Sequence, residues 1–143
     1  MITNLPVPAP AWQGGRMTHR SRLTAVLVDV PASDHEAATA FWSSALGKPA
    51  ERMEKYPEYT FLGQATPGVE FMVQGTGDEQ PRIHIDIESD DVDAEVARLT
   101  ALGATEIGRH NSWVIMRDPV GTVFCVVRVQ VQESFDAHAT TWD

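Results

Sequence analysis

Polar and apolar residues alternate strictly along residues 82–91, which read Arg-Ile-His-Ile-Asp-Ile-Glu-Ser-Asp-Asp. This two-residue period predicts a β-strand with three isoleucines on one side and polar side chains on the other. The apolar side can pack against helices. The polar side carries one imidazole and two carboxylates, the groups that metal binding and acid–base chemistry use: His84, Asp86 and Glu88. The strand is therefore either the floor of a binding site or the solvated face of a half-exposed sheet.

The first half of the chain predicts one strand, one helix and three further strands. Residues 22–30 are rich in β-branched side chains, as is typical of a strand. A helix follows at residues 34–46, with an N-cap offered by the stretch 31–34 and Gly47 as the left-handed residue that ends it. Prolines and glycines then separate three short strands, near residues 50–53, 59–62 and 69–74.

The second half repeats this order after a polar linker at residues 75–80. Asp91 caps a helix whose apolar residues recur at helical spacing, and Leu102-Gly103 ends it as Leu46-Gly47 ends the first. Three strands follow, near residues 105–108, 112–117 and 122–131. The repeat predicts an α+β fold in which two βαβββ modules form a curved eight-stranded mixed sheet around a central cleft.

These elements define one domain at residues 22–131, with module one at 22–74 and module two at 82–131. Residues 1–21 hold several prolines and glycines and are expected to be a flexible leader. Residues 132–143 are expected to be a polar, frayed tail.

Composition narrows the classes of partner. The chain has 143 residues, 43% of them hydrophobic, which suits one globular domain with a core of its own. The formal net charge of -9 argues against nucleic acid or an anionic membrane as a partner, because phosphate binding needs a basic face. The single cysteine, Cys125, cannot form an internal disulfide, which suits a cytoplasmic location.

Three stretches together resemble the vicinal oxygen chelate superfamily. The first runs from Asp34 through Phe41-Trp42 to Gly47, and the second runs from His84 to the helix end at Ala104. The third is Arg-Asp-Pro-Val-Gly at residues 117–121, ahead of Phe124-Cys125. The superfamily includes glyoxalase I, extradiol dioxygenases, bleomycin-binding proteins and fosfomycin-modifying enzymes. The chain is most similar to its glyoxalase-like domains with a His-x-Asp strand.

The resemblance implies a divalent metal held at four cleft positions, one on the first and last strand of each module. His, Gln or Glu normally occupies them. Carried over to this sequence, the positions are Ala25 (or Val26), Met72, His84 and Cys125. Only His84 is a usual ligand for such an ion, so the full ligand set is absent and His84 is only a weak metal candidate.

His84 and Asp86 are the candidate catalytic residues. Both lie on one side of the strand, about 6.5–7 Å apart along it, where a histidine–carboxylate pair can exchange protons with a small substrate. A polar anchor in a binding pocket is the alternative role for the pair. Side chains expected to line the cleft and contact a ligand are Met72, Arg82, Trp113, Cys125 and Trp42.

The favoured function is a glyoxalase-like domain that binds a small molecule in its cleft. If it is an enzyme, we expect metal-free lyase- or isomerase-type chemistry with His84 as the proton-transfer group. One alternative is a protein that sequesters an antibiotic or metabolite. Another is a metal-dependent lyase or dioxygenase whose missing ligands come from a partner chain. The resemblance implies a homodimer.

Overall fold

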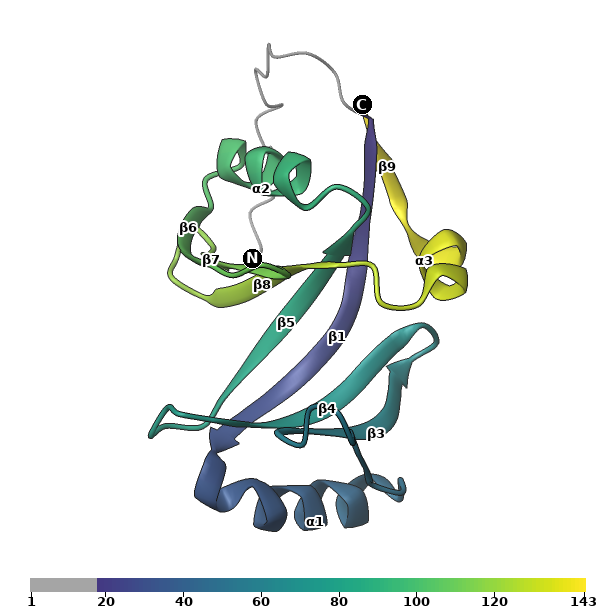
Figure 1. Cartoon of the computed structure of the whole chain (residues 1–143), viewed down its shortest axis with the longest axis vertical. Helices are drawn as coiled ribbons and strands as arrows, with labels where there is room; N and C mark the ends of the chain where they lie inside the picture. Colours follow the sequence, from purple (N-terminus) through teal and green to yellow (C-terminus); the bar gives the residue numbers. More distant parts are fainter. Residues whose placement is uncertain (1–17) are drawn as a thin grey trace, which may run out of the picture.

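One mixed β-sheet runs through the part of the chain that the computed structural model describes, residues 18–143 (Figure 1). The elements in chain order are β1 (His19–Pro31), the 3-10 turn η1 (Ala32–Asp34), α1 (His35–Leu46), β2 (Glu51–Arg52), β3 (Tyr59–Thr66), β4 (Val69–Thr76), β5 (Arg82–Ser89), α2 (Val92–Ala101), β6 (Thr105–Arg109), β7 (Trp113–Arg117), β8 (Val123–Arg128), α3 (Gln132–His138) and β9 (Thr140–Trp142). None of these helices is long and apolar enough to span a membrane.

The strand order confirms the two predicted modules. It is β2-β3-β4-β1-β5-β8-β7-β6, with β9 added beside β1. Within each module the first and last strands pair in parallel, β1 with β4 and β5 with β8. The modules meet where β1 and β5 pair antiparallel along most of their length, and Figure 1 shows these two strands crossing the middle of the molecule.

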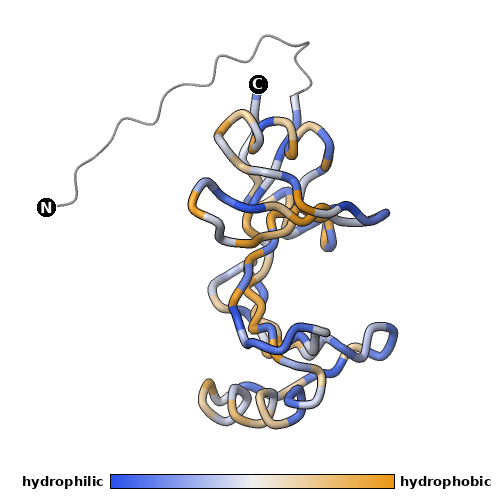
Figure 2. The backbone as a smooth tube through the Cα atoms, turned by 90° about the vertical axis from the view of Figure 1, so that its left-hand side faces the viewer, coloured by the Kyte–Doolittle hydropathy of each residue, from blue (hydrophilic) through white to orange (hydrophobic). Residues whose placement is uncertain are grey.

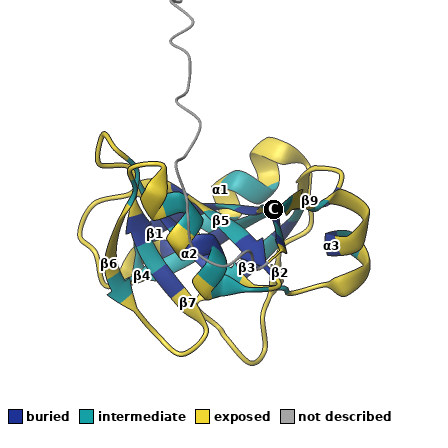
Figure 3. Cartoon of the chain, turned by 90° about the horizontal axis from the view of Figure 1, so that it is seen from above, coloured by how far each residue is buried: buried dark blue, intermediate teal, exposed yellow. Residues whose placement is uncertain are grey.

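Both module helices cover the same side of the sheet. The apolar core beneath α1 contains Val28, Val30, Leu62 and Val73, and the core beneath α2 contains Val114, Met116, Phe124 and Val126. Figure 3 shows that buried residues concentrate in the strands, whereas the loops are exposed. The sheet curves, so the backbone has the outline of a C with the helices outside (Figure 2). We call the side without α1 and α2 the inner face.

The isoleucine side of β5 is only partly covered. Ile87 packs against the core under α2. Ile83 and Ile85 pack against neither of the two core clusters and keep 60% and 38% of their surfaces exposed. The alternating pattern therefore identified the strand correctly, but one of its faces is not fully packed.

The helix ends agree in part with the sequence. The Asp91 carboxylate accepts a hydrogen bond from the Ala94 backbone N–H at 2.9 Å, as expected of an N-cap. Gly47 ends α1 in the left-handed region, at φ 62°. Asp34 makes no capping hydrogen bond, because the chain enters α1 through a 3-10 turn.

The ends of the domain differ from expectation. β1 begins at His19, before the predicted boundary at residue 22, and the rest of the expected leader, residues 1–17, lies outside the described residues. Residues 132–143 are not frayed, because they form α3 and β9. Phe135 is fully buried, and β9 pairs with the beginning of β1. One large apolar side chain in a short helix and a three-residue strand give too weak a pattern to recognise in a polar sequence.

A buried carboxylate fastens α2 to β1. Glu95 is completely buried and lies 2.7 Å from His19 Nε2, and it accepts hydrogen bonds from Ser21 Oγ at 2.9 Å and from Arg98 at 2.7 and 2.9 Å. Trp142 joins the group by donating from Nε1 to Ser21 Oγ at 2.8 Å. Burial alone would raise the pKa of Glu95, but the hydrogen bonds from Arg98, His19 and Ser21 outweigh it and lower that pKa.

We predict that Glu95→Gln lowers the free energy of unfolding by about 2–4 kcal/mol, because it removes a buried charge and leaves its donors poorly matched. A depressed folded pKa gives stability that is present above the ordinary value of 4.5 and is lost as the pH falls below it. Urea unfolding at pH 7 and at about pH 4 should therefore show that acidification lowers the free energy of unfolding less in the variant than in the wild type. Exposed Glu54→Gln is the matched control, and equal unfolding curves for both variants would contradict the prediction.

Candidate functional site

The inner face carries a buried polar centre where β1 meets β5. His84 Nδ1 lies 2.6 Å from Asp29 Oδ2, and His84 Nε2 lies 3.2 Å from Asp86 Oδ1. The strand register explains this arrangement. His84 pairs with Leu27, so antiparallel pairing puts Asp29 of β1 on one side of the imidazole and Asp86 of β5 on the other.

The two carboxylates control the protonation of the imidazole. Burial on its own lowers the pKa of His84, but the interactions with Asp29 and Asp86 outweigh it and raise that pKa to about 9. At neutral pH the metal-free site therefore holds an imidazolium between two carboxylates. Arg82 adds a second positive charge, with its Nε 3.6 Å from Asp29 Oδ2.

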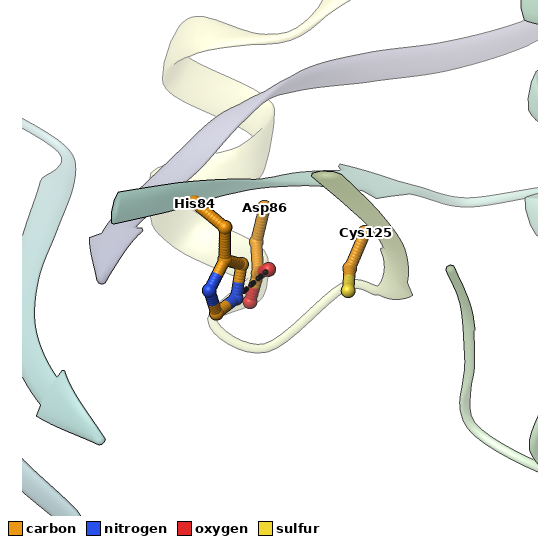
Figure 4. A group of neighbouring side chains, drawn as sticks. All are labelled: His84, Asp86 and Cys125. Carbon is orange, nitrogen blue, oxygen red and sulfur yellow. Dashed lines mark ion pairs between the residues drawn. The ribbon is translucent and has the colours of Figure 1, made fainter. Parts of the chain in front are cut away.

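Cys125 lies on the same face, on the neighbouring strand. It is the register partner of Asp86 across the parallel β5–β8 pair, and its thiol projects to the same side as His84 and Asp86 (Figure 4). Burial raises the pKa of the Cys125 thiol to about 12, and the charges of Asp86 and Asp29 add to the rise. In the metal-free site Cys125 is thus a neutral thiol and not an activated nucleophile.

Two carboxylate oxygens in this centre are buried without a hydrogen-bond partner. They are Asp29 Oδ1 and Asp86 Oδ1, and the contact of the latter with His84 lacks hydrogen-bond geometry. A buried acceptor without a donor costs about 1–3 kcal/mol. Such atoms are rare in folded proteins and are often explained by a bound water, ion or ligand.

Some of the residues predicted to contact a ligand lie near the Asp29–His84–Asp86 centre, and others lie further from it. Met72 is on the inner face, as the register partner of Leu27. Arg82 pairs with Asp29 and Asp78, not with Asp86. Trp113 shares the face of Cys125 but lies one step along the sheet, beside Val127. It stacks on His110 with ring centroids 4.4 Å apart.

The expectation that Trp42 contacts a ligand in the cleft is corrected by the structure. It packs against the core between α1 and the sheet, with its ring centroid 5.8 Å from that of Phe71. It is therefore on the opposite side of the sheet from His84 and cannot contact a ligand there. An aromatic residue in an amphipathic helix serves core packing equally well, so the sequence pattern did not separate the two roles.

Asp29 is the site residue that the sequence reading missed. It is buried, with 2% of its surface exposed, in an otherwise apolar run of β1. A lone acid in such a run is the available signal, since a buried carboxylate needs a partner. Its partner was not evident, because His84 lies in the other module.

The four metal positions implied by the resemblance do not fit a metal. The β1 position next to both Met72 and His84 is Leu27, not Ala25 or Val26. A leucine cannot bind an ion, and a thioether is a poor ligand for a hard one. A different donor set does converge, because single ligand atoms of His84, Asp86 and Cys125 all lie within 4.8 Å of one another.

Two surface hollows lie away from this centre. One, of about 360 Å³, is next to the beginning of α2 and is lined by residues 89–93 and Arg128. The other, of about 120 Å³, lies beside it and includes Trp113 and Arg109. Neither contains a residue of the Asp29–His84–Asp86 centre, and we place the candidate site at that centre because it carries the unpaired and perturbed groups.

Comparison with known proteins agrees with this architecture. The family model of the glyoxalase-like domain matches residues 25–127. The chain belongs to this family. It is thereby a member of the vicinal oxygen chelate superfamily. No curated protein matches this glyoxalase-like domain significantly.

Solved structures show the same fold at low identity. Methylmalonyl-CoA epimerase from Mycobacterium tuberculosis is 16% identical with a TM-score of 0.53, covering 78% of this chain and 90% of its own. A hypothetical protein from Bacillus halodurans is 11% identical with a TM-score of 0.54, covering 78% and 96%. A fusion of a xylose isomerase-like barrel with 4-hydroxyphenylpyruvate dioxygenase is 16% identical with a TM-score of 0.53, covering 97% and 23%. At these identities the likeness extends to the fold alone.

We predict that the His84 imidazole of metal-free protein titrates at about pH 9 in an NMR titration of its ring signals. Asp29→Asn should bring the midpoint down towards the ordinary 6.5, because it removes the negative charge beside Nδ1. A raised folded pKa gives stability that is full below 6.5 and is lost as the pH rises through about 9. Met72→Leu should leave the midpoint in place, and a wild-type midpoint near 6.5 would refute the arrangement.

Proposed function

We propose that this glyoxalase-like domain binds a small organic molecule on its inner face, with Asp29, His84 and Asp86 as the polar anchor. The observation that carries the proposal is the pair of buried carboxylate oxygens without hydrogen-bond partners in that group. Ligand sites typically combine an apolar lining with a few convergent polar groups of perturbed pKa. The anchor has this setting, since Leu27, Met72 and Phe61 are register neighbours across the adjoining strands.

The anchor favours a ligand that donates hydrogen bonds. The unpaired atoms of Asp29 and Asp86 are acceptors, so an amine, amide or hydroxyl group complements them. Tyr59 lies on the same face of β3, and its hydroxyl accepts a hydrogen bond from Gln74 Nε2 at 3.0 Å. Burial is the largest cause that raises the pKa of Tyr59 to about 12, so the phenol stays protonated and can donate.

Proton transfer is a second candidate function, favoured by the Asp29–His84–Asp86 chain of contacts. With its pKa raised to about 9, His84 keeps its proton near neutral pH and would act as a general acid, with Asp29 orienting the ring. Lyase- or isomerase-type chemistry uses such a donor. Fold neighbours named for epimerase and dioxygenase activity are compatible with catalysis on this fold but do not assign a reaction.

We predict that fragments with an aromatic body and an amine or hydroxyl group bind the inner face. A screen of such fragments against isotope-labelled, metal-free protein should shift the amide signals of β1, β4, β5 and β8. Asp86→Asn should weaken the best fragment at least about tenfold, because it removes a charged acceptor worth about 1.4 kcal/mol or more. Glu133→Gln, an exposed acid on α3, is the matched control and should leave the affinity unchanged.

The same screen can contradict the proposal. Fragments that shift only residues near the beginning of α2, around Arg128, would place the ligand site at the surface hollows instead. His84→Ala then separates the two functions on the inner face. A binding protein shows only a change in affinity in this variant, whereas an enzyme also loses turnover of any substrate found.

A further inference from the structure

We propose that the C-terminal segment, residues 130–142, forms one end of the ligand site on the inner face and so limits the length of the ligand. The segment contains α3 and β9, and Phe135 is the side chain that anchors it. This inference rests on the proposed function, because it concerns the boundary of that same site.

The strand register arranges the inner face in rows that cross the sheet. The row of His84 also contains Leu27 and Met72, the apolar neighbours of the polar anchor. Asp86 lies in the next row, and Glu88 lies one row further, about 6.5 Å beyond Asp86 along β5. A ligand that is anchored at His84 and Asp86 and extends in this direction therefore meets whatever covers Glu88.

The row of Glu88 is covered by protein. Glu88 has 0% of its surface exposed and the Arg22 side chain only 6%, although both lie on the side of the sheet without α1 and α2. Asp86, one row back, keeps 17% of its side chain exposed. One Glu88 oxygen accepts a hydrogen bond from Arg22 Nε at 2.6 Å, and the other accepts from the Gln130 backbone N–H at 2.9 Å. The C-terminal segment thus begins directly on Glu88.

The helix of this segment lies over the beginning of β1 on the same face. Arg20 shares the inner face with Arg22, and its guanidinium carbon lies 4.8 Å from the centroid of the Phe135 ring. The same guanidinium donates to Asp136 Oδ1 at 2.9 Å. Figure 1 shows α3 beside β1, next to the turn that joins β3 to β4. Phe135 is fully buried in this position, so it holds α3 against the sheet.

The segment reaches module one at the turn between β3 and β4. Gly68 in this turn is buried and has a positive φ of 81°. A Cβ at this position would lie 2.6 Å from His138 Cδ2 and 3.2 Å from Arg22 Nη1, so the imidazole packs directly on the glycine. The segment therefore spans the inner face from Glu88 on β5 to the turn of module one.

A boundary of this kind selects compact ligands. The ion pair beneath the segment is fully paired, in contrast to the Asp29–His84–Asp86 centre, so it does not call for a ligand of its own. A ligand that reached over Glu88 would have to displace the segment and expose Phe135 to water. Exposing a buried phenylalanine side chain lowers the affinity by about tenfold or more.

The test compares a short and a long amine, benzylamine and 4-phenylbenzylamine, on the isotope-labelled full chain. In the wild type we expect both to shift the amide signals around His84 and Asp86, and neither to shift those of Glu88 and Gly68. In Phe135→Ala the amides of α3 and β9 should exchange with solvent at least about 100-fold faster, because their buried anchor is lost. The long amine should then bind at least about tenfold more tightly than to the wild type and shift Glu88, whereas the affinity of benzylamine should stay the same.

Further variants separate this effect from damage to the fold. Phe135→Leu keeps an apolar anchor and should bind both amines like the wild type. Gly68→Ala pushes on the segment from the other end, because its Cβ collides with His138, and it should also favour the long amine. Gly63→Ala is the matched control, since Gly63 has a similar φ of 79° but a Cβ there meets Lys48 only at 3.6 Å. If Phe135→Ala does not fold, the two glycine variants decide.

Two outcomes would overturn the inference. One is an equal affinity of the long amine for the wild type and for a variant in which exchange shows that the segment is released. The other is a wild-type complex in which the long amine already shifts Glu88 and Gly68. In both cases benzylamine on the inner face would leave the proposed function intact. If neither amine reached the inner face of any variant, the proposed function would fail and this inference with it.

Discussion

The antiparallel pairing of β1 with β5 is the interaction on which the rest of the structure depends. It joins the two modules into one sheet and sets the Leu27–His84 register. A shift of one residue would turn Asp29 and His84 to opposite sides of the sheet, because side chains alternate along a strand. The same shift would take Val28 and Val30 out of the core beneath α1. Core packing and the polar centre are therefore fixed by one register.

The buried charges on β1, β5 and α2 fall into two kinds. Arg22 with Glu88, and Glu95 with its donors, are fully paired, with the Arg22–Glu88 contact at 2.6 Å. They fix the register and the docking of α2. Asp29 Oδ1 and Asp86 Oδ1 accept no hydrogen bond, although His84 lies between the two carboxylates and its Nε2 is 3.2 Å from Asp86 Oδ1. Removing charge from water costs free energy that paired groups only partly regain, so incomplete pairing is explained better by binding than by stability.

The strand and helix pattern was readable from the sequence because period and capping are local properties. The alternation at residues 82–91, the Asp91 cap and the glycine after each helix led to the correct elements and to the two-module sheet. His84 and Asp86 were found for the same reason, since two residues on one strand share a face. Asp29 was missed and Trp42 misplaced, because their surroundings depend on contacts between distant segments. The ordered C-terminal segment depends likewise on the burial of Phe135, which only the folded domain provides.

The two modules repeat their backbone but not their chemistry. Leu27-Val28-Asp29 on β1 and His84-Ile85-Asp86 on β5 have an acid at the same spacing, and Leu27 is the register partner of His84. At this pair of positions, module one has an apolar leucine where module two has a polar histidine. Module one supplies the apolar residues Leu27 and Met72 and the Asp29 carboxylate beside His84, and module two supplies His84 and Asp86. Because the antiparallel pairing places an acid on each side of position 84, an imidazole there has a carboxylate near each ring nitrogen. Leu27, at the partner position, has no polar atom that could pair with a carboxylate. The sheet therefore has one polar centre at this pair of positions.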